Sequence, residues 1–142
     1  MGTFHVDIDG GCWGNPGEAG AGVVIVFPDG RREEHTVYLG QATNNVAEYA
    51  ALLAALGRLR ELGATEVEIR TDSQLLARQL AGEYRVRAPH LQPLWRRAQE
   101  LLGRFSRVAI RFVPREQNAR ADALAEQAIA GKRSTLPSPL AP

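Results

Sequence analysis

The sequence has few of the residues that build disulfides, zinc sites and membrane spans. Its 142 residues include one cysteine, Cys12, and three histidines, which excludes an internal disulfide and a multi-cysteine zinc site as organising features. The histidines His5, His35 and His90 lie far apart, without the spacing of metal ligands. No run approaches the roughly 18 apolar residues of a transmembrane helix, and the first ten residues are too polar for a signal peptide. We therefore expect a mature, cytoplasmic protein that does not contact membranes. We also expect a monomer, since the sequence shows no extra apolar surface stripe.

Charges of opposite sign are separated along the chain, although the formal net charge is only +1. Residues 1–84 carry 6 basic and 12 acidic side chains, a net charge of −6, whereas residues 85–142 carry 11 and 4, a net charge of +7. This asymmetry predicts a basic surface for a polyanion and an acidic cluster for a cation. An arginine-rich face that contacts only solvent is the alternative explanation for the basic half.

The hydrophobic pattern predicts three strands followed by alternating helices and strands. Apolar residues recur at period 2 from Phe4 to Ile8, and turn residues separate this segment from two further strand-like runs, 21–27 and 31–39. From Asn44 the period becomes helical. The remaining pattern gives a strand at 67–71, helices near 74–80 and 91–102, a strand at 108–112, and a last helix that ends near Gly131.

This order of elements predicts an α/β domain, with one mixed sheet flanked by helices, over residues 1–131. We find no internal repeat and no linker between two cores. Residues 132–142 are rich in proline and serine, and we expect them to form a disordered C-terminal tail.

Four carboxylates stand at strand ends or beside apolar stripes, where an acidic group is costly unless something neutralises it. Each also has an ordinary structural explanation, because such residues cap helices, form turns or favour a helix N-terminus. Together they would form an all-oxygen site, which suits hard divalent cations such as Mg²⁺ or Mn²⁺. Two such ions support hydrolysis of a phosphodiester. The four residues are Asp9, Glu48, Asp72 and Asp122.

Four motifs surround these carboxylates. They are Asp9-Gly10-Gly11 with Gly14-Asn15-Pro16-Gly17, then Thr43-Asn44-Asn45-x-x-Glu48, then Thr71-Asp72-Ser73-Gln74, then Asn118-x-x-x-Asp122-x-Leu124-Ala125. In order and spacing they resemble the type 1 ribonuclease H family. The resemblance covers about residues 4–130, and the four motifs in register are specific although each alone is weak.

The resemblance implies a ribonuclease H-like fold with strand order 3-2-1-4-5 and an endonuclease that cuts the RNA strand of RNA–DNA hybrids. It makes the four carboxylates the catalytic ligands of two Mg²⁺ or Mn²⁺ ions, with Asp9 bridging both and Asp7 as the rival for that position. The products would carry 5′-phosphate and 3′-hydroxyl ends. The implied substrate contacts are Asn15, Thr43, Asn44, Asn45 and Gln74.

The chain departs from the best-known family members in two places. Its connection before the last helix is short and lacks their histidine, so Arg115 and Glu116 are candidates for a partial replacement. Residues 81–91 are too few for the basic extension of many bacterial members, which likens the chain to the compact archaeal-like branch. A non-catalytic hybrid-binding module, or a related nuclease acting on duplex RNA or DNA, is the alternative function.

Overall fold

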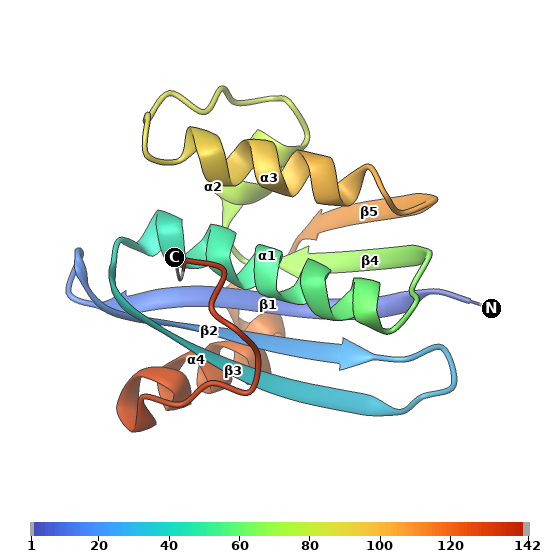
Figure 1. Cartoon of the computed structure of the whole chain (residues 1–142), viewed down its shortest axis with the longest axis horizontal. Coiled ribbons are helices and arrows are strands. Elements are labelled where there is room, and N and C mark those ends of the chain that lie inside the picture. Colours follow the sequence, from blue (N-terminus) through green and yellow to red (C-terminus); the bar gives the residue numbers. More distant parts are fainter. Residues whose placement is uncertain (1, 141–142) are drawn as a thin grey trace.

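The computed structural model describes residues 2–140 and contains a five-stranded sheet with helices on both faces (Figure 1). The strand order is β3-β2-β1-β4-β5, in which β1, β2 and β3 are antiparallel while β4 and β5 run parallel to β1. The predicted α/β class, element order and strand order are confirmed. The elements are β1 (Phe4–Trp13), β2 (Gly17–Val26), β3 (Arg32–Ala42), α1 (Asn44–Glu61), β4 (Glu66–Thr71), α2 (Gln74–Leu80), α3 (Gln92–Leu102), β5 (Arg107–Phe112), the short 3-10 helix η1 (Arg115–Asn118) and α4 (Ala119–Gly131).

Turn chemistry in the sequence accounts for the hairpin between β2 and β3. Gly30 has a φ of 91°, which favours glycine, and its N–H donates to the Phe27 carbonyl at 2.9 Å. The Phe27 N–H in turn donates to the Arg31 carbonyl at 2.8 Å. The Pro28-Asp29-Gly30 signal therefore forms the tight turn that the sequence predicts.

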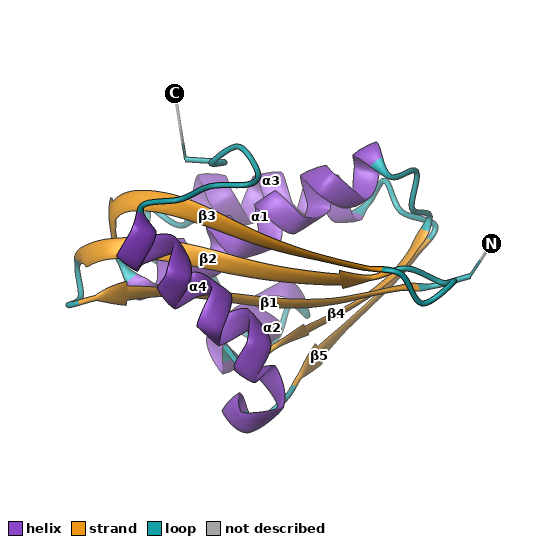
Figure 2. Cartoon of the chain, turned by 90° about the horizontal axis from the view of Figure 1, so that it is seen from below, coloured by secondary structure: helices purple, strands orange, loops and turns teal. Residues whose placement is uncertain are grey.

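The helices divide between the two faces of the sheet, as Figure 2 shows. Helix α1 covers one face and α3 packs against it, whereas α4 covers the opposite face. The apolar stripe of α1 is buried, with Leu52, Leu56 and Leu59 at most 1% exposed. Within residues 2–140 no helix has both the length and the apolar character needed to cross a bilayer.

The C-terminal segment differs from the sequence expectation of a disordered tail over 132–142. Its described residues, 132–140, follow the outer edge of β3 and then reach the face covered by α1 (Figure 1). Ser134 Oγ accepts from the Tyr38 N–H at 2.8 Å, and the Thr135 N–H donates to the Thr36 carbonyl at 2.7 Å. Leu136 is only 9% exposed and joins the hydrophobic core. Side-chain hydroxyls, buried Leu136 and partly buried Leu140 thus order a segment of low-complexity composition.

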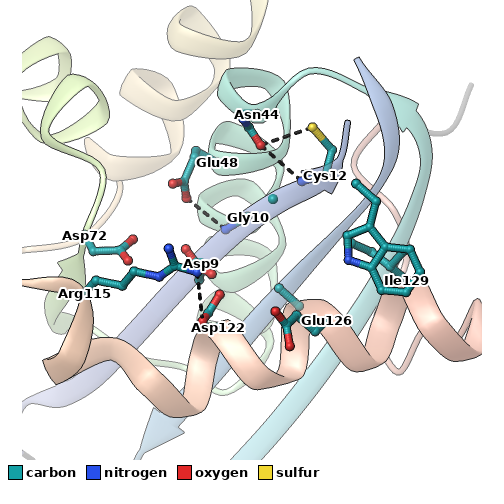
Figure 3. Close-up of a pocket in the computed structure, with 13 residues that line it drawn as sticks. Asp9, Gly10, Cys12, Asn44, Glu48, Asp72, Arg115, Asp122, Glu126 and Ile129 are labelled. Carbon is teal, nitrogen blue, oxygen red and sulfur yellow. Dashed lines mark hydrogen bonds and ion pairs between the residues drawn. The ribbon is translucent and has the colours of Figure 1, made fainter. Parts of the chain in front are cut away.

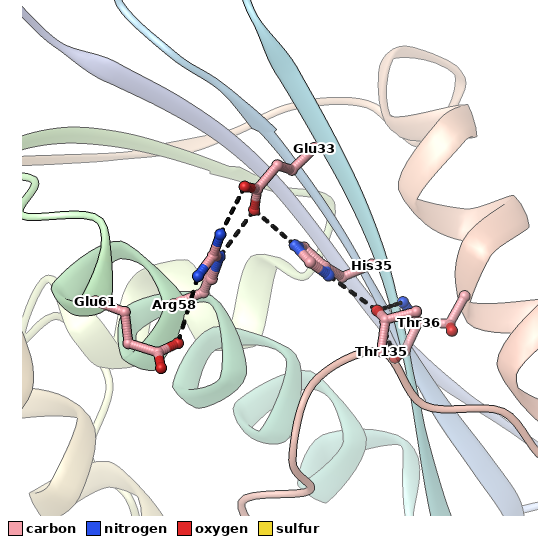
Figure 4. A network of polar contacts seen from close by, with 6 residues as sticks. All are labelled: Glu33, His35, Thr36, Arg58, Glu61 and Thr135. Carbon is pink, nitrogen blue, oxygen red and sulfur yellow. Dashed lines mark hydrogen bonds and ion pairs between the residues drawn. The ribbon is translucent and has the colours of Figure 1, made fainter.

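A polar network ties this segment to α1 through β3 (Figure 4). The His35 ring bridges Thr135 Oγ1 at 2.9 Å and Glu33 Oε1 at 2.8 Å. The guanidinium of Arg58 in α1 donates to both oxygens of Glu33, at 2.9 and 2.7 Å. These contacts lower the pKa of Glu33 to about 2, with the Arg58 hydrogen bonds as the largest cause.

Candidate active site

Three carboxylates from different elements converge in a cavity of about 420 Å³ at one end of the sheet (Figure 3). Asp9 extends from β1, Glu48 from α1, and Asp72 follows β4. Each places a carboxylate oxygen within 4.8 Å of the others. Asp122 of α4 lines the same cavity but does not belong to this tight group. The structure therefore brings all four predicted carboxylates to one place, three of them within mutual reach of a single ion.

The local structure decides against helix capping as the explanation for Glu48 and Asp72. Asn45 and Glu48, three residues apart, have the spacing of a capping box, but Thr43 caps α1 by accepting from the Val46 N–H at 3.2 Å, so Glu48 takes no part in the cap. Ser73 caps α2 by accepting from the Leu76 N–H at 3.1 Å.

Asp9 lies within β1 rather than in a turn. Asp122 does lie in the first turn of α4, where a negative charge favours the helix. For Asp9, Glu48 and Asp72, the observed capping and strand geometry leaves the carboxylates directed to the cavity.

A close approach of α1 to β1 positions Glu48. A Cβ atom on Gly10 would lie 2.1 Å from the Ala47 carbonyl oxygen, so only glycine allows this packing. The Gly10 N–H donates to Glu48 Oε1 at 2.9 Å. Glycine next to Asp9 thus lets helix and strand meet and also supplies the donor that orients the neighbouring carboxylate.

A second glycine brings α4 and Asp122 to the opposite side of Asp9. Gly22 pairs with Asp9 across β1 and β2, and a Cβ there would lie 2.1 Å from the Ala121 carbonyl oxygen. At the start of α4, buried Asn118 donates through Nδ2 to the Ile8 carbonyl at 2.8 Å. These contacts fix the first turn of α4 against β1, and this turn carries Asp122.

Burial and mutual repulsion strongly perturb the carboxyl groups. Burial, followed by the charges of Glu48 and Asp72, raises the pKa of Asp9 to about 10. Burial also raises the pKa of Glu48 to about 8, although the Gly10 hydrogen bond acts in the opposite direction. Two carboxyls that resist ionisation side by side mark a place where a cation would be strongly stabilising.

The donor set fits a hard divalent cation. The tight group contains only carboxylate oxygens, and the cavity has no histidine among its described lining residues. Oxygen ligands of this kind suit Mg²⁺, Mn²⁺ or Ca²⁺ better than softer metals. Asp9, Glu48, Asp72 and Asp122 are therefore the residues that would hold such ions here.

Asp7, the rival of Asp9, is occupied elsewhere. Its two oxygens accept from Arg70 at 2.7 and 2.9 Å, and Arg70 also donates to the Gln117 carbonyl at 3.2 Å. Asp7 does not line the cavity. The structure thus places Asp9 rather than Asp7 in the acidic cluster.

The five residues implied as substrate contacts lie at different places around the cavity. Asn44 lines it, and its Oδ1 accepts from the Cys12 N–H and from Cys12 Sγ, both at 3.1 Å. Asn15 Oδ1 accepts from the Asn44 N–H at 3.1 Å, which joins the turn between β1 and β2 to the start of α1. Thr43 is the cap of α1, whereas Asn45 and Gln74 are exposed first-turn residues of α1 and α2. None of Asn15, Thr43, Asn45 and Gln74 lines the cavity itself.

Arg115 and several residues to which the sequence analysis gave no role also line the cavity. Arg115, one of the two candidates for replacing the absent histidine, places Nη2 3.5 Å from Asp122 Oδ2, whereas Glu116 is not a lining residue (Figure 3). Trp13 and Glu126 also line the cavity. Trp13 could have been found from its period-2 spacing to Asp9, and Glu126 from its place one helical turn after Asp122.

Comparison with known proteins places this architecture among nucleic-acid enzymes. A family model described as "Reverse transcriptase-like" matches residues 7–128. Ribonuclease HI of Halobacterium salinarum is 45% identical over 129 residues, which are 90% of this chain and 65% of that protein. The crystal structure of RNase H1 from this archaeon superposes with a TM-score of 0.87 at 44% identity, covering 92% of this chain and 99% of the other.

A further solved relative carries a nucleic acid. LC11-RNase H1, solved in complex with an RNA/DNA hybrid, is 41% identical with a TM-score of 0.85, covering 91% of this chain and 98% of that one. The first curated relatives are longer. They include a bifunctional protein of Mycobacterium tuberculosis that is 42% identical over 126 residues, 87% of this chain, and the chain spans only 35% of their length.

Proposed function

Because this chain belongs to the type 1 ribonuclease H family, we propose that it is an endonuclease that uses divalent metal ions to hydrolyse the RNA strand of RNA–DNA hybrids. The convergence of Asp9, Glu48 and Asp72 within 4.8 Å, with Asp122 on the same cavity, carries this proposal. A binding module that had lost catalysis would not need to keep four carboxylates in so unfavourable an arrangement.

The proposed roles follow from the positions of the side chains. Asp9 faces Glu48, Asp72 and Asp122, and these four carboxylates would together hold two ions of Mg²⁺ or Mn²⁺. When bound, such ions activate water for attack on the phosphodiester and stabilise the leaving oxygen. Hydrolysis in this way leaves 5′-phosphate and 3′-hydroxyl ends.

The rest of the chain holds this ligand set in position. The Gly10 N–H keeps one oxygen of Glu48 fixed, and the Asn118 amide keeps the first turn of α4 against β1. Arg115 supplies a positive charge beside Asp122, where a substrate phosphate would approach. Preorganised groups of this kind need no rearrangement when the substrate binds.

The proposed hybrid contacts surround the cavity on the side of α1. Cys12 fixes the oxygen of the Asn44 amide, so its NH₂ group is free to donate to the substrate. Asn15, Thr43, Asn45 and Gln74 would add contacts at the rim. Recognition of 2′-hydroxyls and of the wide, shallow minor groove distinguishes RNA from DNA without reading bases, so we expect little sequence preference.

Part of the basic half of the sequence gathers around a second cavity, formed by the loop between α2 and α3. Arg85, Arg87 and Arg96 line this cavity of about 730 Å³ together with Tyr84 and Trp95. Arginines grouped with aromatic side chains are typical of surfaces that bind a nucleic-acid backbone. This grouping favours a nucleic-acid contact over a face that contacts only solvent. The monomeric state and the cytoplasmic location stay predictions.

A cleavage panel tests the proposed function. The purified chain is incubated with an RNA–DNA hybrid, duplex RNA, duplex DNA and single-stranded RNA, each with Mg²⁺, Mn²⁺ or EDTA. We expect cleavage of the RNA strand of the hybrid that requires the metal. Preferred cleavage of duplex RNA or DNA would instead support a related nuclease, and no cleavage of any substrate would support a binding module.

The variant Asp72→Asn tests the site within the same assay. Even outer partners of metal ligands contribute about 10- to 100-fold to activity, so we expect a loss of more than about a hundredfold, with an unchanged circular dichroism spectrum. The matched control is Glu100→Gln, an exposed carboxylate of α3 whose substitution should leave the rate unchanged. Full activity of Asp72→Asn would refute the assignment of the site.

A further inference from the structure

Trp13 is exposed in the same cavity as the carboxylates, where no packing requirement explains it. Its side chain is 54% exposed, which makes it one of three large apolar side chains that residues 2–140 present to solvent. The other two, Tyr84 and Phe112, lie outside the carboxylate cavity. A single exposed aromatic side chain is common, but one that lines a charged cleft is placed to contact a ligand bound there.

The strand geometry relates Trp13 directly to Asp9. Residues two apart in a strand project to the same face, so Asp9, Gly11 and Trp13 share one face of β1. At about 3.3 Å per residue, Trp13 lies roughly 13 Å along the strand from Asp9. A Cβ on Gly11 would meet nothing within 4 Å, so the stretch of strand between the two side chains is bare and open.

The chemistry of this end of the cavity suits a sugar rather than a phosphate. Ala125, Glu126 and Ile129 of α4 line the cavity together with Trp13, and Glu126 adds a negative charge. Ile129 approaches Gly20, which pairs with Gly11 of β1, so it lies toward Trp13 rather than toward Asp9. The only cation among the described lining residues is Arg115, which contacts Asp122 instead. A phosphate would be repelled by Glu126, whereas the apolar face of a ribose can pack on an indole, and its hydroxyls can donate to a carboxylate.

We propose that Trp13 contacts the ribose face of an RNA-strand nucleotide that neighbours the cleaved phosphodiester, and that it thereby contributes to the binding of the hybrid. This inference rests on the proposed function, because a nucleotide would reach Trp13 across Gly11 only if the RNA strand of a bound hybrid passes the carboxylates. The displacement along β1 means that Trp13 meets a neighbouring nucleotide and not the cleaved bond. Trp13 is therefore a binding residue whose loss raises KM and leaves kcat nearly unchanged.

Steady-state kinetics with three variants test the kinetic consequence. Trp13→Ala removes the apolar surface on which the ribose packs, and the loss of that burial should raise KM roughly tenfold, with kcat within about twofold. Trp13→Phe should keep most of the affinity. Phe112→Ala is the matched control, since Phe112 is 50% exposed and lies outside the cavity, and its KM should not change. An unchanged KM in Trp13→Ala overturns the proposal.

Fluorescence reports the contact without any turnover. The chain has two tryptophans, so Trp95→Phe leaves Trp13 as the only indole. Combining Trp95→Phe with Asp72→Asn should prevent cleavage of the hybrid during the measurement. Saturating hybrid should then change the emission of Trp13, whereas duplex DNA of the same sequence should change it less. Equal changes with both duplexes, or no change with the hybrid, contradict a ribose contact.

Two results distinguish a failure of the Trp13 contact from a failure of the proposed function. Hybrid cleavage by the wild-type chain, together with a Trp13→Ala variant of unchanged KM, removes the Trp13 contact and leaves the proposed function intact. A wild-type chain that fails to cleave the hybrid with either metal removes the proposed function, and with it the basis for the Trp13 contact.

Discussion

Arg70 of β4 holds both carboxylate oxygens of Asp7 on the neighbouring strand β1, at 2.7 and 2.9 Å. The two residues are direct cross-strand partners in the parallel pairing. This pairing neutralises Asp7 and keeps it out of the acidic cluster, although Asp7 shares a strand face with Asp9. Through its bond to the Gln117 carbonyl, the same guanidinium also fixes the segment that leads into α4.

Asp7→Asn should therefore weaken the fold and spare the chemistry. Losing a partly exposed, two-bond ion pair costs about 1 kcal/mol, so we expect a melting temperature lower by about 2–4 °C. Metal-dependent cleavage of the hybrid should persist at the temperature of the assay. Thermal denaturation and a cleavage assay measure the two effects. Loss of activity in a folded Asp7→Asn variant would mean that Asp7 belongs to the active site.

Gly22→Ala should disturb both stability and catalysis from outside the cavity. The added Cβ would lie 2.1 Å from the Ala121 carbonyl oxygen, so α4 must move away from the sheet and take Asp122 with it. Overpacking of this kind costs about 1–3 kcal/mol, and kcat should fall as Asp122 leaves Asp9. Chemical denaturation and steady-state kinetics measure these changes.

Gly57→Ala is the matched control for this substitution. Gly57 lies exposed within α1, and a Cβ there would meet nothing within 4 Å. Alanine in a helix is more favourable than glycine by up to about 1 kcal/mol, so this variant should gain stability and keep its kcat. If Gly22→Ala behaved in the same way, the close contact between α4 and β2 would not be needed.

The raised pKa values predict how stability depends on pH in the metal-free protein. Unfolding returns Asp9 and Glu48 to their ordinary pKa values of 3.8 and 4.5, whereas the folded values are about 10 and 8. Above about pH 4 the unfolded chain therefore releases protons that the folded chain retains, and the free energy of unfolding falls as pH rises toward 8. In EDTA we expect a lower melting temperature at pH 8 than at pH 5.

A divalent cation should reverse this loss. Binding favours ionised carboxylates, so metal affinity rises with pH, and a concentration of 100 Kd stabilises by about 2.7 kcal/mol. Mg²⁺ or Mn²⁺ should raise the melting temperature more at pH 8 than at pH 5, and less in Asp72→Asn than in the wild-type chain. Equal gains at both pH values would mean that the cation binds elsewhere.

Arg115→Ala tests whether this arginine assists catalysis where the best-known family members carry a histidine. Its side chain is 75% exposed, so stability should change by less than about 0.5 kcal/mol. We expect kcat to fall about tenfold, in the range known for groups that support metal ligands, and Arg115→Lys to recover part of it. Arg120→Ala, which removes the same charge from a pair with Glu34, is the control and should retain kcat.

Local patterns in the sequence predicted the elements and the α/β class, because period-2 and helical spacings depend only on neighbouring residues. The four carboxylates were singled out beside apolar stripes and predicted strand ends, although Asp9 lies within β1 and Glu48 within α1. The strand order came from the resemblance to a known family. The sequence did not predict the course of residues 132–140. Leu136 is an isolated apolar residue among prolines and serines, and its neighbours bond to β3 from about 100 residues away, so no local pattern reveals the packing.

The residues around the carboxylates were harder to infer for a related reason. Asn45 competes with Thr43, and Asp72 with Ser73, as helix caps, and only the observed hydrogen bonds decide between them. Trp13 and Glu126 are relevant to the site because they line the same cavity. They do so only because α4 approaches β2 closely. Sequence spacing within one element cannot reveal such a distance between two elements.

The C-terminal segment has a further effect at the outer edge of the sheet. An edge strand ordinarily presents unpaired N–H and C=O groups, which invite pairing with another chain. Here the Thr36 N–H and carbonyl and the Tyr38 N–H are already bonded to Ser134 and Thr135. The molecule therefore protects this stretch of β3 with its own C-terminal residues, which leaves less exposed backbone from which aggregation between copies could start.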